Sequence, residues 1–430
     1  VMLISLCTKR YTNYEPRGNT HVIGRNRVVI TGLGVLAANG IGKDAFWSSL
    51  LAGESGIGPV SLFDASDIPH AVVGEVKNFD PEVYIDRSYK PRRMARFTQL
   101  ALAAAYSAIE DADIHDEIKK TTVPICMGVS TSATEVIENQ VLRINERGVR
   151  SASPLTAITS LPQAGAGTIA TILGLKTEAL TVSTGCPAGL DAIAIAFDSI
   201  RRGKRDIAIA GGADAPITKL TLATFDAANM IPSTHKHPEV ASRPFDQNRD
   251  GGVIAEGACV LILENLEHAL ARGAEPLLEI QGYGLSGDTS DNQPGSGLYD
   301  SMSEALINAG LMPKQVDYIS AHGPSDQHLD YIETVSIKKL FGKYAYKLPI
   351  SSIKGVTGNP LAAAGPLQIA ACLKAMKYGV LPPTANYQTP DPHCDLDYIP
   401  EARKTKIDVA MINNHGFGGS NSSMVVKRFK

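Results

Sequence analysis

Cys186 stands where a nucleophilic cysteine is expected, between an apolar strand and a helix. The strand is predicted at residues 179–183, and Pro187 suits the first position of a helix that Gly203 ends. One apolar face of this helix carries Leu190, Ile193, Ala194, Phe197 and Ile200. The dipole and the free N–H groups of a helix N-terminus favour thiolate over thiol. Cys186 is therefore either a nucleophile or simply a small residue in a tight turn.

His322 and Lys354 each follow a predicted strand in the second half of the chain. An imidazole at a strand end is placed to polarise a carbonyl or to move a proton. Asp330 and Glu333 follow His322, and Glu333 is a conceivable ion partner for Lys354. The alternatives are a structural histidine and a solvated surface lysine.

A glycine-rich segment lies near the C-terminus, where residues 413–421 read NNHGFGGSN. Gly416, Gly418 and Gly419 can present bare backbone N–H groups to an oxyanion, and they can also flex. Asn359 follows another glycine turn, after Lys354. An ordinary loop explains the glycine-rich segment equally well.

A metal site is not expected. His235 and His237 have a possible metal spacing, but no carboxylate or cysteine stands immediately beside them to complete a ligand set. The six cysteines are scattered without CxxC spacing, which argues against both a zinc site and a disulfide framework: Cys7, Cys126, Cys186, Cys259, Cys372 and Cys394.

Composition excludes several classes of partner. The chain has 430 residues, 44% of them hydrophobic, and a formal net charge of -3 without a basic block, so nucleic acid is not an expected partner. No apolar run approaches the roughly 20 residues that span a bilayer, and residues 1–7 lack the features of a signal peptide. We expect a cytoplasmic protein without membrane contact.

Strands and helices alternate from residue 27 onward, the pattern of a layered α/β fold with largely parallel sheets. Each half offers five strands in the same sequence of contexts, which indicates an internal repeat. The predicted strands are 28–31, 124–129, 179–183, 206–210 and 259–263 in the first half, and 277–281, 316–320, 348–352, 408–412 and 423–426 in the second. We expect a first half at 27–273, a second half at 274–430, and a tail or added leader at 1–26. An insertion is expected around residues 60–120.

Six segments resemble the β-ketoacyl synthase family, of the type II elongating kind, and the resemblance covers nearly all of residues 27–429. The matching segments are VSTGCPAGLDAI around Cys186, PFDQNRDGG, LENLEHALARGA, SAHG with His322, SSIKGVTGN with Lys354, and HGFGGSN. The resemblance implies the thiolase-like fold, two βαβαβαββ halves stacked in five αβαβα layers, usually as a dimer. The repeat found above agrees with it.

The same resemblance implies a mechanism without a bound cofactor. Cys186 would accept an acyl group from the phosphopantetheine of an acyl carrier protein, and a malonyl thioester would then lose carbon dioxide and attack the acyl-cysteine. Backbone N–H groups of Cys186 and Phe417 would form the oxyanion hole, with Phe417 also gating entry. Lys354 and Glu333 would order the site, with Asp330, Gly416 and Gly418 supporting it. The partner subunit would be a second copy or a related ketosynthase.

Several residues depart from the family pattern. Asn359 occupies the position of the family's second histidine, which gives a Cys186-His322-Asn359 set, and an amide can still donate a hydrogen bond to a thioester oxygen. Pro324 and Asp326 replace threonines that usually contact phosphopantetheine, and His415 replaces a phenylalanine. Pro187 stiffens the turn after the cysteine.

Three functions follow from these residues. The first is an active condensing enzyme of fatty-acid or polyketide-type metabolism. The second is an acyl-holding or acyl-transferring synthase that no longer elongates, which Asn359, Pro324 and Asp326 favour. The third is a non-catalytic subunit resembling a chain-length factor, against which the retention of Cys186, His322 and Lys354 argues. Because the last predicted strand ends at residue 426, we expect a free-standing enzyme or an excised domain.

Overall fold

The computed structural model describes residues 26–68, 71–232, 237–289, 294–416 and 418–430. All ten predicted strands are present, with ends that differ by a few residues. The first series comprises β1 (Val28–Ala37), β5 (Ile125–Gly128), β6 (Ala179–Val182), β7 (Ile207–Asp214) and β8 (Gly257–Asn265). The second comprises β9 (Leu278–Gly287), β10 (Tyr318–Ser320), β11 (Ile350–Ser351), β14 (Val409–His415) and β15 (Ser420–Lys427).

The two series share one strand order. From its outer edge inward, each runs third, second, fourth, fifth, first: β6-β5-β7-β8-β1 and β11-β10-β14-β15-β9. The series meet where β1 pairs with β9 from Val28↔Ile280 to Ile30↔Leu278. This contact joins the two series into one sheet, in which the ten strands and the short β2 (Gly40–Ile41), paired with β1, make eleven. The exact boundary between halves at residues 273 and 274 stays a prediction.

The sheet is mixed, and the expectation of largely parallel sheets is corrected. β5 pairs in parallel with β6 and β7, and β10 does so with β11 and β14. The last strand of each series instead returns antiparallel, β8 beside β7 and β15 beside β14. Residues 416–419 are enough to connect β14 to β15, since antiparallel neighbours need only a short turn.

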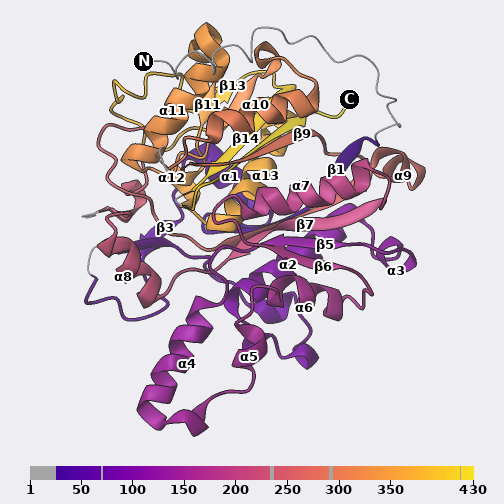
Figure 1. The fold of residues 1–430 in the computed structure, drawn as a ribbon, viewed down its shortest axis with the longest axis vertical. Helices are drawn as coiled ribbons and strands as arrows, with labels where there is room; N and C mark the ends of the chain where they lie inside the picture. Colours follow the sequence, from indigo (N-terminus) through magenta and orange to yellow (C-terminus); the bar gives the residue numbers. More distant parts are fainter. Residues whose placement is uncertain (1–25, 69–70, 233–236, 290–293, 417) are drawn as a thin grey trace, which may run out of the picture.

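Helices separate the two strand series and cover their outer faces, which gives five layers (Figure 1). The middle layer holds α7 (Ala188–Arg201) and α13 (Ala364–Tyr378), whose apolar side chains share one core with strands of both series. One outer layer holds α2 (Arg96–Ala112) and α6 (Ala164–Ile172), and the other holds α10 (Leu298–Ala309) and α11 (Gln327–Phe341). The expected thiolase-like α/β architecture is confirmed.

Alternating apolar residues let a single strand serve two layers. On β8, Cys259, Leu261 and Leu263 join the middle core, whereas Val260 and Ile262 join the core under α2. The predicted apolar face of α7 is likewise buried in the middle layer.

Residues 60–120 are not simply an insertion, because they contain α2, the outer-layer helix of the first half. The signal was the run of small and apolar residues on that helix, of which twelve residues in all are buried, Thr98 and Gln99 included. The part of this region that lies outside the main sheet includes β4 (Val72–Gly74), which pairs with β3 (Ile57–Pro59) in a separate two-stranded sheet.

Other described α-helices and strands complete the structure. They are α1 (Lys43–Ala52), α3 (Glu117–Lys120), α4 (Thr134–Arg147), α5 (Thr156–Thr159), α8 (Lys219–Ala227), α9 (Leu266–Ala271), α12 (Lys354–Thr357), and the paired β12 (Val380–Leu381) and β13 (Arg403–Lys404). α4 and α5 project from the body beyond α6 (Figure 1). Among the described residues, no helix has the length and apolarity that crossing a membrane requires.

Candidate active site

Cys186 lies in the turn between β6 and α7, as the sequence predicts. Gly185 has a φ of 76°, which glycine adopts without strain, and Pro187 then caps the helix that begins at Ala188. The thiol is partly exposed and faces a cavity of about 160 Å³. Burial nevertheless raises the pKa of Cys186 above its ordinary value, against the lowering effects of the Lys354 charge and the Asn359 amide. The helix N-terminus alone therefore does not keep the cysteine as a thiolate.

Close packing fixes the start of α7. A Cβ on Gly189 would lie 2.1 Å from the Ala362 carbonyl oxygen, so only glycine lets the helix approach residues 361–363. Asp191, in the first turn, accepts hydrogen bonds from Thr184 and Ser422. These contacts tie the cysteine turn to β15 in the second half.

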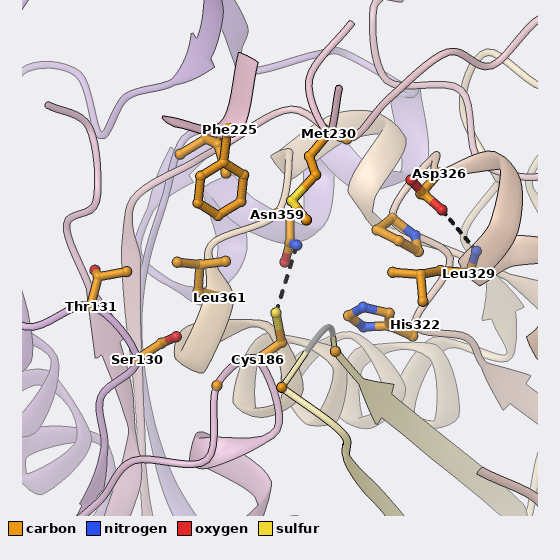
Figure 2. A pocket seen from close by; sticks show the side chains of 16 residues that line it. Ser130, Thr131, Cys186, Phe225, Met230, His322, Asp326, Leu329, Asn359 and Leu361 are labelled. Atoms are coloured by element: carbon orange, nitrogen blue, oxygen red, sulfur yellow. Dashed lines mark hydrogen bonds between the residues drawn. The ribbon is translucent and has the colours of Figure 1, made fainter. Parts of the chain in front are cut away.

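His322 and Asn359 lie on the second half and line the same cavity as Cys186 (Figure 2). The Asn359 Nδ2 is 4.0 Å from the Cys186 Sγ. His322 is buried, and neither of its ring nitrogens has a hydrogen-bond partner among the described residues. Burial, followed by the nearby Lys354 and His415, holds the pKa of His322 well below its usual range. A neutral imidazole and an amide thus converge beside the thiol, both with unused donor capacity.

Glu333 holds the backbone at His322. Its Oε1 accepts from the His322 N–H at 3.0 Å, and its Oε2 accepts from the Gly323 N–H at 2.9 Å. Burial acts to raise the pKa of Glu333, but His415 and these two N–H groups outweigh it, so the net shift is downward. Glu333 is therefore an ionised anchor for the loop that carries His322.

Lys354 is fully buried and donates from Nζ to the His322 carbonyl oxygen at 2.6 Å. Within the described part of the chain, no ion pair joins Lys354 to Glu333, so the pairing expected from the sequence is not direct. Burial lowers the pKa of Lys354 to about 8, while the charges of Glu333 and Cys186 oppose that change. His322 is thus held by Glu333 at its N–H and by Lys354 at its carbonyl.

Asp330 supports the site from a distance. It accepts from the Phe245 N–H at 2.7 Å and lies 3.4 Å from the Arg249 Nε. Burial raises the pKa of Asp330 to about 8, against the opposing charge of Arg249. The PFDQNRDGG segment is in this way fixed to α11, which also carries Glu333.

The glycine-rich segment closes the cavity beside Cys186. A Cβ at Gly416 would lie 3.5 Å from the Cys186 Sγ, and both Gly416 and Gly418 line the cavity. Phe417, expected to gate the site and to donate an N–H, lies outside the described residues. His235 also lies outside them, and the expectation of no metal site stays a prediction.

The rest of the lining is mostly apolar, from Phe225, Met230, Ile254, Leu329 and Leu361. Asp326 lies beside Leu329 and away from Phe225 (Figure 2). Its Oδ1 caps α11 by accepting from the N–H groups of His328 and Leu329 at 2.9 and 2.8 Å. Pro324 also lines the cavity. A carboxylate is therefore fixed in the cavity by its capping role.

Sequence reasoning missed Asp214, which holds the cavity-lining residues Ser130 and Thr131. Its carboxylate accepts from the N–H groups of Ser130, Thr131 and Ala362, and burial raises its pKa to about 6. The only signal was an acidic residue at the end of an apolar strand, DIAIAGGAD.

A five-layer thiolase-like fold with a cysteine at a helix N-terminus beside a buried histidine defines an acyl-transferring enzyme of the condensing type. Family comparisons agree: the N-terminal domain of beta-ketoacyl synthases matches residues 25–269, and the C-terminal domain matches residues 277–388. The chain belongs to the β-ketoacyl synthase family.

The similar proteins include a 3-oxoacyl-[acyl-carrier-protein] synthase and a polyketide synthase subunit. The 3-oxoacyl-[acyl-carrier-protein] synthase 2 of Coxiella burnetii is 38% identical over 412 residues, covering 94% of this chain and 99% of the relative. The tetracenomycin polyketide synthase ketoacyl synthase alpha subunit of Streptomyces glaucescens is 37% identical over 419 residues, covering 94% and 97%. The solved ishigamide ketosynthase/chain length factor superposes with a TM-score of 0.89 at 32% identity, covering 94% of this chain and 100% of that one.

Proposed function

We propose that this enzyme performs a decarboxylative Claisen condensation between an acyl group on Cys186 and a malonyl group on an acyl carrier protein. The observation that carries the proposal is the convergence of Cys186, His322 and Asn359 on one cavity, with 4.0 Å between the Asn359 Nδ2 and the thiol. The substrates are carried on phosphopantetheine, and no bound cofactor takes part.

The first half-reaction transfers the acyl group. The Cys186 sulfur attacks the acyl thioester carbonyl, and the carrier thiol leaves with the proton that the cysteine gives up. The Cys186 N–H stabilises the oxyanion, and the family resemblance assigns the second donor to Phe417. Because Lys354 lowers the pKa of Cys186, it favours the thiolate that attacks.

The second half-reaction forms the carbon–carbon bond. The malonyl carboxylate leaves as carbon dioxide, and its bonding electrons pass to the α-carbon of an enolate. His322 and Asn359 donate hydrogen bonds to the thioester oxygen as negative charge develops there. The α-carbon then attacks the acyl-cysteine carbonyl, and the Cys186 thiolate departs. Since burial holds the pKa of His322 well below its usual range, the imidazole donates as a neutral group, and Asn359 stands in for an imidazole without adding charge.

Intact-mass analysis tests this function. The parent is incubated with acyl-carrier protein and then with malonyl-carrier protein, beside Cys186→Ala and Asn359→His. We expect an acyl adduct on the parent and an extended ketoacyl-carrier product, with neither formed by Cys186→Ala. Absence of any adduct with every tested donor would contradict the proposal.

An acyl-holding synthase is the second candidate, and Asn359 and Asp326 favour it. The carboxylate of Asp326 lies in the cavity that the malonyl carboxylate must enter, and like charges there are unfavourable. This candidate predicts acylation of Cys186 without extension, and restoration of extension by Asn359→His. The same mass measurement separates the two.

A second ketosynthase-like subunit is the proposed protein partner besides the carrier. β6 ends the sheet order with an edge unpaired among the described strands, and Leu180 on it is 47% exposed. The projecting α4 and α5 expose further apolar side chains, namely Ile137, Val141, Leu142 and Ile158. An edge strand beside an apolar surface favours pairing with another subunit. The cytoplasmic location stays a prediction.

Positive charges on the exposed edge of β6 and on α5 should prevent two subunits from associating. We expect Leu180→Lys combined with Ile158→Lys to shift the parent from the mass of two chains to that of one in multi-angle light scattering. Leu270→Lys, on the exposed α9, is the matched control and should leave the assembly intact. If the double variant keeps the parent's mass, the subunit contact lies elsewhere.

A further inference from the structure

His415 is a second buried imidazole that the condensation scheme does not use. It ends β14, next to Gly416, and its side chain has no exposed surface. Neither ring nitrogen has a hydrogen-bond partner in the described residues. His415 does not line the cavity, so it reaches the substrates only through other residues.

The His415 ring lies between the anchor of His322 and a glycine. Its Nε2 is 3.8 Å from the Glu333 Oε2, and its centroid is 4.5 Å from that of His322 at an interplanar angle of 54°. On the other side, a Cβ at Gly295 would lie 2.8 Å from the His415 Nδ1. The ring is therefore confined in a position where one nitrogen faces the carboxylate.

Glu333 transmits any effect of His415 to the loop at His322. The Oε2 that faces His415 also accepts from the Gly323 N–H, and the Oε1 accepts from the His322 N–H and from Asn413 at 3.1 Å. A change in the charge or orientation of this carboxylate would move the backbone that places the catalytic imidazole.

We propose that His415 is a positioning residue for the condensation: it orients Glu333, backs the ring of His322, and so sets how His322 meets the malonyl thioester. The inference rests on the proposed function. With His415, the enzyme has two imidazoles near its reaction centre, although Asn359 stands at the position of the family's second histidine. The second imidazole lies behind His322 and not beside Cys186.

The charged surroundings give this role a pH signature. The titratable and charged groups around Glu333 and His415 include His322 after β10, Lys354 on α12, Asp330 on α11 with Arg249, Tyr398, Cys186 before α7, and Asp288, which accepts from the Gly295 N–H. His415 lowers the pKa of Glu333, whereas burial acts to raise it. Without His415 the pKa of Glu333 rises. When the pH is lowered, Glu333 therefore becomes protonated, and stops acting as an ionised anchor, at a higher pH than in the parent. The acid limb of activity should therefore move upward in pH.

The test compares His415→Phe with His415→Gln, since an amide N–H can still donate to Glu333 and a phenyl ring cannot. We expect His415→Phe to lower kcat by roughly 10- to 100-fold with KM within about twofold, because misplacement of a catalytic group affects the reaction more than binding. His415→Gln should keep kcat within about threefold. The acid limb of the kcat profile should shift upward only in the phenylalanine variant.

A second readout keeps the inference separate from the proposed function. The pH dependence of Cys186 alkylation by iodoacetamide needs no condensation, and we expect His415→Phe to change it while His415→Gln does not. A parent that alkylates but never condenses would refute the proposed function and leave this comparison valid. If the phenyl ring is too large beside Gly295 for folding, His415→Leu replaces it. Parent-like pH profiles for the phenylalanine or leucine variant, or equal defects in the glutamine variant, would overturn the inference.

Discussion

Lys354→Met is expected to lower kcat by about 10²- to 10³-fold, the range found when one preorganised donor is removed from a reaction centre. The methionine leaves the buried His322 carbonyl without the donor that now lies at 2.6 Å. It also removes a positive charge that lowers the pKa of Cys186, so that pKa rises further. The pH midpoint of iodoacetamide alkylation should therefore move upward, and fewer thiolates should form at neutral pH.

Lys374→Met is the matched control for this experiment. Lys374 is also a buried lysine, with a side chain that is 3% exposed and an ion pair to Asp44 at 2.5 Å. It lies on α13 and does not line the cavity. We expect parent-like kcat and alkylation for Lys374→Met. Equal losses in both variants would mean that burial of a lysine, and not its place beside His322, explains the effect.

Gly189→Ala is expected to lower the free energy of unfolding by about 3 kcal/mol or more, as overpacking against rigid backbone does. Helix propensity alone predicts the opposite, a gain of about 1 kcal/mol when alanine replaces a helical glycine. The added methyl would lie 2.1 Å from the Ala362 carbonyl oxygen and 2.7 Å from the Pro366 Cδ, so packing outweighs propensity. Urea denaturation measures the difference.

Gly287→Ala is the control for this stability measurement. It lies in the exposed end of β9, where the nearest atom to a new Cβ is 3.8 Å away, so little change is expected. A Gly189→Ala variant that is as stable as the parent would show that α7 can move away from residues 361–363. In that case Cys186 would be expected to shift with it, and its alkylation rate should change.

The ten strands could be predicted because apolar runs bounded by glycine and polar residues carry a local signal. The position of Cys186 could be predicted for the same reason, since Pro187 and the apolar face of α7 are neighbours in sequence. The true partner of Lys354 could not. Which atom its ammonium meets depends on how the turn after β11 is oriented against the loop after β10, and no local pattern encodes that orientation.

Asp214 shows a second limit of the sequence. The Asp214 carboxylate accepts hydrogen bonds from the N–H groups of residues 130, 131 and 362. These groups come together only when the first and second halves pack against each other. The same holds for His415, whose position beside Glu333 joins the end of one strand to the middle of a helix. The family pattern flagged His415 as a departure, but only the three-dimensional contacts suggest a role for it.

The matching strand order of the two series has a consequence for how such an enzyme can originate. Cys186 comes from the first half, whereas His322, Lys354 and Asn359 come from the second, so neither half carries all of the proposed reaction centre. A single ancestral unit with this strand order would have needed a second copy of itself to assemble one. If such a unit were duplicated and fused, each copy would be free to lose the groups that the other retained, and the proposed nucleophile and its donors would end on different halves of one polypeptide.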